Sequence, residues 1–338
     1  MKTNIDVKKF NESIKECPDR FTQVLVEKTD LDTIGSFFMH KLAGRIEDDC
    51  AITSLRGQAL PEQLNNPQTL CIECGGSGDI DKGNFDHHAE GGPEESATLQ
   101  TLKTLPKSKL SLEIIHLANY IDSLDRYDQE QIKLKYQNTV FPTLSDIVAG
   151  INLKHFREPV VALKTGSQVI ENILATGQKP TGPISGFDEF AELKKNNDEQ
   201  IDLVRKNVKF LKTSRGNYIG HLETKFFGAP NIIYQEGLKK YGTDETIVAV
   251  AHNPKFGPEN NENKFTIGLN HSPQIAKEKD ISLKKLADKL NDPSLDSVVD
   301  LEKRKTWGGP PTGTVIGSPK GGTNLNMKQV LSEIEKLY

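Results

Sequence analysis

The sequence predicts an α/β fold, with a doubly wound parallel sheet domain followed by a smaller α+β domain. In residues 1–137, short apolar runs alternate with longer segments whose apolar residues recur every three or four positions. This alternation of strands and helices is typical of a parallel sheet wound with helices. Beyond residue 155, two long helical patterns come first and a group of strand-like runs follows, which indicates a separate α+β domain.

The elements of the first domain follow from local patterns. An amphipathic helix is expected up to about residue 20, and the β-branched run TQVLVEKTD predicts a strand through Val26. DTIGSFFMHKLAGRI predicts a helix, because Ile34, Phe38 and Ile46 recur at helical spacing. AITSLRG and QTLCIECGG are short apolar runs typical of buried strands. Residues 109–137 then read as a helix with one polar interruption.

We place the domain boundary at residues 138–155, which contain a proline and lose clear periodicity. The second domain then covers residues 156–338. Its two long helical patterns precede four strand-like runs, NYIGHLE, PNIIYQEG, ETIVAVAHN and KFTIGLN. A helix over ISLKKLADKL, a glycine-rich loop TWGGPPTGTVIGSPKGG and a terminal helix over NMKQVLSEIEKLY complete the prediction.

Composition narrows the class of protein. The 338 residues, of which 35% are apolar and 27% charged, suit a soluble globular chain long enough for two domains. A net charge of −4 disfavours long duplex nucleic acid as a partner and favours a small substrate. No apolar run approaches the roughly 18 residues of a membrane span, and the polar N-terminus has no signal-peptide core. We therefore expect a cytoplasmic protein without a membrane partner, and leave open whether it forms a homodimer.

Acidic and imidazole side chains gather where the expected strands end. Three motifs carry them: VEKTDLDTIGS with Asp30 and Asp32, CIECGG with Glu73, and NFDHHAEGG with Asp86, His87 and His88. In open α/β sheets, ligands bind outside the carboxyl ends of the strands. Carboxylates suit Mg²⁺ and Mn²⁺, and imidazole suits the later first-row metals. This mixed set predicts a metal centre, in which two ions about 3.5 to 4 Å apart would hold a phosphoryl group.

These motifs resemble those of the DHH phosphoesterase superfamily. TDLDTIGS is similar to the family's first motif, an Asp-x-Asp pair that runs into an Ile-Gly-Ser helix start, and FDHH is similar to the motif that names the superfamily. IDSLDRYD, with Asp122 and Asp125, resembles the fourth motif, and the loop TWGGPPTGTVIGSPKGG resembles the glycine-rich loop of the family's substrate domain. The resemblance covers the first 125 residues motif by motif and the rest only by architecture.

The resemblance implies a function. The chain would be a metal-dependent phosphoesterase that hydrolyses a phosphodiester with a metal-activated water and uses Mn²⁺ or Mg²⁺, with two ions expected. Its substrate would be a small nucleotide, a dinucleotide or a short single-stranded oligonucleotide. Residues 1–137 would form the metal-binding catalytic domain, and residues 156–338 a DHHA1-like domain that closes over the substrate.

The resemblance also implies roles for single residues. Asp86 would orient the neighbouring imidazole, and His88 would face the scissile phosphate. The implied metal ligands are Asp30, Asp32, Glu73, His87 and Asp125, with Asp122 as the rival of Asp125. The implied substrate contacts are Trp307, Gly308, Gly309, Arg304 and Lys320.

Two departures from the family pattern keep other functions open. Val26 stands where the family commonly has a histidine, and Glu73 stands where it usually has an aspartate. A one-metal site, or a catalytically silent protein that binds a nucleotide or a partner, would fit these changes. A third alternative is a zinc-dependent hydrolase that uses His87 and His88 together with the cysteines, since Cys71 and Cys74 have Cys-x-x-Cys spacing.

Plainer structural roles compete with the functional ones. Either Asp30 or Asp32 would serve as the N-cap of the helix that begins near Thr33. Trp307 suits a core position and a base-stacking position equally well. At least one of Asp122 and Asp125 is expected on a solvated helix face.

Overall fold

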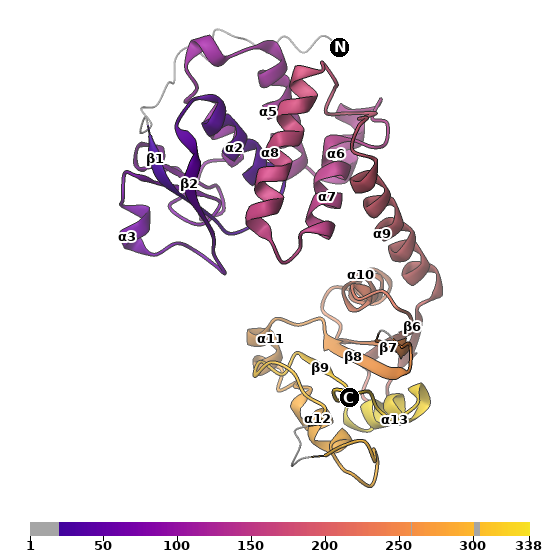
Figure 1. Cartoon of the computed structure of the whole chain (residues 1–338). Helices are drawn as coiled ribbons and strands as arrows, with labels where there is room; N and C mark the ends of the chain where they lie inside the picture. Colours follow the sequence, from indigo (N-terminus) through magenta and orange to yellow (C-terminus); the bar gives the residue numbers. More distant parts are fainter. Residues whose placement is uncertain (1–19, 258, 301–304) are drawn as a thin grey trace. The chain divides into compact units, whose positions relative to one another are not determined.

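The computed structural model describes residues 20–257, 259–300 and 305–338. Two compact units divide the chain, the first ending at Lys195 and the second beginning at Asn196 (Figure 1). The amphipathic helix expected at the N-terminus lies outside the described residues. None of the described helices combines the length and the apolar character that crossing a membrane requires.

A parallel sheet of four strands lies at the centre of the first unit. The strands are β1 (Phe21–Val26), β2 (Ile46–Ser54), β3 (Thr69–Ile72) and β4 (Asn84–Phe85). Their order in the sheet is β2-β1-β3-β4, and every neighbouring pair is parallel. The predicted α/β class is therefore confirmed.

Helices surround this sheet. They are α2 (Leu31–Leu42), α3 (Pro61–Leu64), α4 (Ala97–Leu102), α5 (Leu112–Arg126), α6 (Gln129–Lys135), α7 (Leu144–Lys154), α8 (Pro159–Ala175) and α9 (Asp188–Asn207). Of these, α2, α3, α4 and α8 contact the strands of the sheet directly. Two short 3₁₀ turns, Ile80–Lys82 and Lys107–Lys109, join the elements. Because side chains alternate along a strand, Val24 and Ile72 face the larger core, whereas Leu25 and Cys71 join a smaller apolar cluster with Leu64 of α3.

The helix predicted to run through Ile46 ends earlier. Helix α2 stops at Leu42, and Gly44 adopts a positive φ of 75°, which turns the chain into β2. Ile46 is therefore the first residue of a strand, and it is buried there. Glycine adopts this left-handed conformation without steric cost, so the Ala-Gly pair that follows Leu42 marks the end of the helix.

The predicted linker at residues 138–155 contains a helix instead. Thr143 and Asp146 form a capping box, in which each side chain accepts a hydrogen bond from the other residue's backbone N–H. Helix α7 follows, and Leu144 and Ile147 are fully buried in the core of the first unit. Residues 138–155 thus belong to the first unit, and the division of the chain falls later than the sequence predicts, within α9.

The second unit is built on a mixed sheet. Its strands are β5 (Lys209–Lys212), β6 (Tyr218–Glu223), β7 (Ile247–Phe256), β8 (Glu262–Leu269) and β9 (Val315–Gly317), in sequential order. Only β6 and β7 run parallel. The helices are α10 (Ala229–Tyr241), α11 (Pro273–Glu278), α12 (Lys284–Leu290) and α13 (Met327–Leu337). This arrangement confirms a second domain that mixes helices with a largely antiparallel sheet.

One predicted strand of this unit is wrong. The run PNIIYQEG forms part of α10. Pro230 lies in the first turn of the helix, where its fixed φ is favourable and its missing N–H costs nothing. Ile233 and Gly237 are four residues apart and both are buried, so the pair of isoleucines that suggested a strand lies on the helix face that packs on the sheet.

Trp307 is a core residue of the second unit, which decides between the two roles that the sequence left open. The side chain is 2% exposed and packs with Phe265 in the apolar cluster under α12 and α13. Its indole N–H donates to Asp296 Oδ2 at 3.0 Å, and Asp296 is fully buried. The ring is therefore enclosed by its own unit and has no free face on which a base could stack.

Truncating this tryptophan should destabilise the second unit. We expect Trp307→Ala to lower the free energy of unfolding by about 3 to 5 kcal/mol, because a large core side chain is lost and Asp296 loses a donor. Urea denaturation would measure the change. Val315→Ala, at a position that is 39% exposed in the same sheet, is the control and should change stability by about 0.5 kcal/mol or less. Equal effects of the two substitutions would contradict the core position.

Candidate metal centre

The register of the parallel strands brings the motifs together at one edge of the sheet. Val26 of β1 pairs with Ile72 of β3, and Ile72 pairs with Phe85 of β4. The next residues in the chain, Glu73 and Asp86, therefore leave neighbouring strands at the same level. The acidic and imidazole side chains that follow these strands therefore lie at one edge of the sheet.

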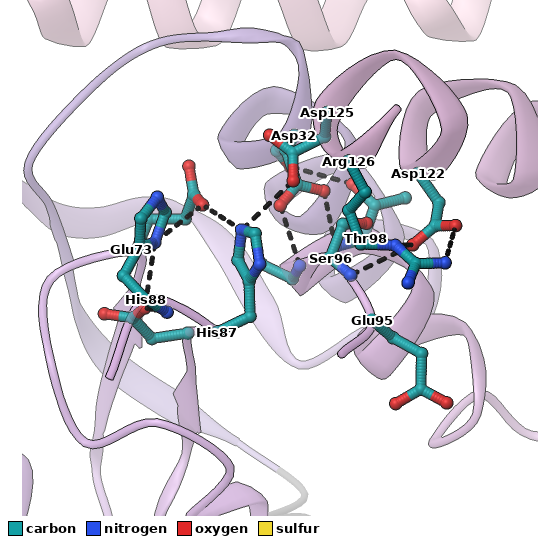
Figure 2. Close-up of polar contacts among 12 residues, drawn as sticks. Asp32, Glu73, His87, His88, Glu95, Ser96, Thr98, Asp122, Asp125 and Arg126 are labelled. Carbon is teal, nitrogen blue, oxygen red and sulfur yellow. Dashed lines mark hydrogen bonds and ion pairs between the residues drawn. The ribbon is translucent and has the colours of Figure 1, made fainter. Parts of the chain in front are cut away.

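Four side chains converge at this edge (Figure 2). They are Asp32 from α2, Glu73 after β3, His87 after β4 and Asp125 from α5, and one potential ligand atom of each lies within 4.8 Å of all the others. His87 Nε2 is 3.3 Å from Glu73 Oε1 and 3.0 Å from Asp125 Oδ2. Three carboxylates and one imidazole thus surround a common point, which makes this group a candidate metal site.

Asp32 is fixed by the beginning of α4. Its Oδ2 accepts a hydrogen bond from Ala97 N at 2.7 Å, and its Oδ1 accepts one from Thr98 N at 2.8 Å. Helix α4 approaches α2 closely because α2 has Gly35 at the contact, where a Cβ atom would lie 2.5 Å from Thr98 Oγ1. The glycine of the TDLDTIGS motif therefore allows the contact that holds Asp32 in place.

Glu73 reaches the cluster from an unusual backbone conformation. Its φ is +51°, a left-handed value that few non-glycine residues adopt, and its side chain is fully buried. Oε2 accepts a hydrogen bond from Thr33 Oγ1 at 3.1 Å, whereas Oε1 has no hydrogen-bond partner in the described part of the chain. His87 Nε2, although close to two carboxylates, is likewise buried without an aligned partner.

Asp86 holds the loop that carries both histidines. Its carboxylate accepts hydrogen bonds from Gly75 N at 2.6 Å and from His88 N at 2.8 Å, and its Oδ1 is 3.1 Å from His88 Nδ1. Burial opposes ionisation of this carboxyl, but the hydrogen bonds from His88 and Gly75 outweigh it and lower the pKa. Asp86 therefore lies beside the imidazole of His88.

Two of the implied ligands do not join this group. Asp30 caps α2, because its Oδ1 accepts a hydrogen bond from Thr33 N at 3.0 Å. Asp122 forms a two-point ion pair with Arg126, at 2.8 and 2.6 Å, and accepts a hydrogen bond from Ser96 N. Neither belongs to the donor groups found among the described residues, whereas Asp125 does.

The residues implied as substrate contacts lie in the second unit, and the structure describes four of them. Trp307 is in the core, whereas Gly308, Gly309 and Lys320 are exposed. Arg304 lies outside the described residues. The cysteines of the alternative zinc site, Cys71 and Cys74, are buried beneath α3 and belong to no donor group in the described part of the chain.

Several supporting residues escaped the sequence analysis. Thr33 orients Glu73, and the backbone of α4 fixes Asp32; no local pattern reveals such contacts between distant segments. The ion pair of Asp122 with Arg126 could have been found, because residues four apart in a helix lie side by side. Lys28, whose Nζ is 3.4 Å from His88 Nε2, also went unnoticed in the loop after β1.

Comparisons with known proteins place the chain among distant structural neighbours. No family model and no curated protein matches the sequence. The solved structures that it resembles include the pGpG-specific phosphodiesterase PggH of Vibrio cholerae, with 12% identity, a TM-score of 0.47, and coverage of 94% of this chain and 98% of that one.

Two further neighbours have lower scores. The DHH domain of a member of the s1p family of ribosomal proteins has 15% identity and a TM-score of 0.39 over 94% of this chain and 86% of its own. CDC45 from Entamoeba histolytica has 9% identity and a TM-score of 0.37 over 94% and 95%. Because all three scores are below 0.5, the function proposed below rests on the side chains of the site.

The clustered groups hold protons tightly. Burial raises the pKa of Glu73 to about 7 and, with the nearby charge of Asp125, that of Asp32 to about 6. The close carboxylates of Asp125 and Glu73, 3.0 and 3.3 Å from Nε2, raise the pKa of His87 to about 10, against the effect of burial. Each group binds a proton more strongly in the folded than in the unfolded chain, so the metal-free protein should lose stability as the pH rises.

Comparing Glu73→Gln with the wild type isolates one of these groups. As the pH rises from about 4.5 towards 7 and above, the metal-free wild type should lose stability relative to the variant, because only the wild type must ionise a buried carboxyl there. Thermal unfolding in the presence of a chelator would measure this difference. Glu130→Gln, at an exposed position, should show no such trend. A constant difference between Glu73→Gln and the wild type across this range would contradict the assignment.

Proposed function

We propose that the chain is a metal-dependent phosphoesterase that uses Mn²⁺ or Mg²⁺ to hydrolyse a phosphodiester of a dinucleotide or a short single-stranded oligonucleotide. The convergence of Asp32, Glu73, His87 and Asp125 on one point carries this proposal. Asp32 and Glu73 are buried, so a group that adds Asp125 and an imidazole to them is unfavourable unless protons or a cation offset its charge. A divalent cation bound there would serve that purpose.

The donor set suits such an ion. Oxygen ligands are preferred by Mg²⁺ and Mn²⁺, and one nitrogen ligand is acceptable to Mn²⁺. Glu73 Oε1 and His87 Nε2 are buried without aligned hydrogen-bond partners, so each can offer a lone pair to a metal once its proton has been released. The other oxygen of Glu73 and both oxygens of Asp32 accept hydrogen bonds from Thr33 and α4, which fix the directions of these ligands.

The surrounding residues supply positioning and access. A bound divalent ion would polarise a phosphoryl oxygen and lower the pKa of a water molecule. Asp86 holds the imidazole of His88, whose side chain is 48% exposed and so lies on the solvent side of the site. Thr33 and the N–H groups of Ala97 and Thr98 keep Glu73 and Asp32 from turning away while the substrate binds. The net charge of the chain agrees with a small substrate rather than long duplex nucleic acid.

A catalytically silent nucleotide-binding protein is the second candidate. Val26 and Asp30 favour it: the valine is fully buried and offers no nitrogen ligand, and the aspartate is engaged as a helix cap. These residues reduce the donors available to a second ion, but they leave the four-residue group intact. Measuring substrate hydrolysis distinguishes the phosphoesterase from the silent binding protein.

The number of ions can be tested directly. The four side chains of the candidate site surround a single point. We therefore expect one tightly held Mn²⁺ per chain, with a second ion bound much more weakly. Titration of the metal-free protein followed by electron paramagnetic resonance would count free and bound Mn²⁺. Asp32→Asn should abolish the tight site, whereas Asp188→Asn, in the first turn of α9, should preserve it. Two equally tight ions would show that further ligands complete a second site.

Hydrolysis of dinucleotides and short oligonucleotides with added Mn²⁺ tests the activity itself. Removing a residue that merely orients a metal ligand often costs about 10- to 100-fold in activity, so removing a ligand should cost more. We expect His87→Ala to lower kcat/KM by more than about 100-fold. His116→Ala, at an exposed position on α5, is the matched control and should retain activity. A folded, metal-loaded wild type without turnover on any of these substrates would favour the silent binder.

A further inference from the structure

Lys28 lies beside the metal site without an acidic partner. Its Nζ is 3.4 Å from His88 Nε2, and no carboxylate lies within ion-pair distance of it among the residues that the structure describes. This is unusual, because acidic side chains are abundant nearby. They are Asp30, Asp32, Glu73, Asp86 and Asp125. Arg126, another cation of this region, is held by Asp122 instead.

In the contact between Lys28 and His88, the lysine is the hydrogen-bond donor and the imidazole is the acceptor. The Asp86 carboxylate can only accept a hydrogen bond, so the nitrogen of His88 that faces it, Nδ1, carries the proton. In the neutral ring, Nε2 then has a lone pair, which accepts a hydrogen bond from the Lys28 ammonium. Asp86, His88 and Lys28 thus form a chain of hydrogen bonds, and its outer end is a positive charge. The Nε2 atom of His88 is occupied and donates nothing to a substrate in this arrangement.

The backbone around Lys28 is fixed on both sides. Val26, two residues earlier, is hydrogen-bonded within the sheet. On the other side, Thr29 O accepts a hydrogen bond from Asn152 Nδ2 at 2.8 Å, and Thr29 Oγ1 donates to Asn152 Oδ1 at 3.1 Å. Asp30 caps the helix that follows. The lysine is therefore an exposed side chain on an anchored loop, held near the metal ligands by geometry as well as by charge.

We propose that Lys28 binds the phosphate of the substrate. An ammonium group has three donors, so Lys28 can keep its hydrogen bond to His88 and donate another to a non-bridging phosphoryl oxygen. His88 then acts as a positioning residue for this lysine. Lys28 also supplies positive charge on the side of the site where Val26 and Asp30 leave few ligands for a second ion. This inference rests on the proposed phosphoesterase function and assigns the group that recognises the anionic substrate.

Removing the charge while keeping the length of the side chain tests the proposal. Lys28→Met should raise the dissociation constant of inorganic phosphate for the Mn²⁺-loaded protein by about tenfold to hundredfold, the usual effect of losing a charge-assisted hydrogen bond. KM for the hydrolysed dinucleotide should rise by a similar factor. Lys28→Arg should restore most of both. Lys107→Met, at an exposed position of the same unit, should match the wild type.

Binding of Mn²⁺ separates this proposal from the phosphoesterase function. Lys28→Met should bind Mn²⁺ within about twofold of the wild type and unfold at the same temperature, because an exposed lysine adds little to stability. If the wild type hydrolyses the substrate and Lys28→Met binds phosphate equally well, the role of Lys28 is overturned and the phosphoesterase function stands. If the wild type binds neither Mn²⁺ nor phosphate, both are overturned.

Discussion

The repulsion among Asp32, Glu73 and Asp125 is the constraint on which the rest of the site depends. Two of these carboxyl groups, Asp32 and Glu73, are buried, so the three remain together only if protons, an imidazolium or a metal ion offset their charge. The raised pKa values of Asp32, Glu73 and His87 express this in the metal-free protein. A divalent ion would replace the protons, so metal binding and proton release are coupled at this site.

The fold maintains this unfavourable arrangement through contacts outside the cluster. Parallel register aligns the ends of β3 and β4, so Glu73 leaves the sheet beside the loop of residues 86–88. Gly35 lets α4 approach α2, and the first N–H groups of α4 then bind Asp32. Asp125 comes from α5, which also uses Asp122 and Arg126 to hold the residue before α4. Four elements therefore cooperate, and no single one of them makes the site.

The sequence predicted what depends on short-range order. The strand ends, the acidic motifs and the two histidines were all located, because alternation and spacing are visible in one dimension. It failed where tertiary contacts decide: the capping box before α7 was taken for a linker, and the two isoleucines of α10 for a strand. The choice between Asp125 and Asp122 needed the position of Arg126, and the roles of Thr33 and Lys28 needed the folded loops. Trp307 was undecided until Asp296 proved to be its buried partner.

Pulsed electron paramagnetic resonance of the Mn²⁺-loaded protein tests the central claim most directly, because it detects nitrogen atoms bound to the ion. The account predicts a signal from one directly coordinated nitrogen in the wild type. The signal should persist in His88→Ala and disappear in His87→Asp, where a carboxylate still offers an oxygen ligand. Loss of the nitrogen signal in His88→Ala, with its retention in His87→Asp, would contradict the proposed metal centre.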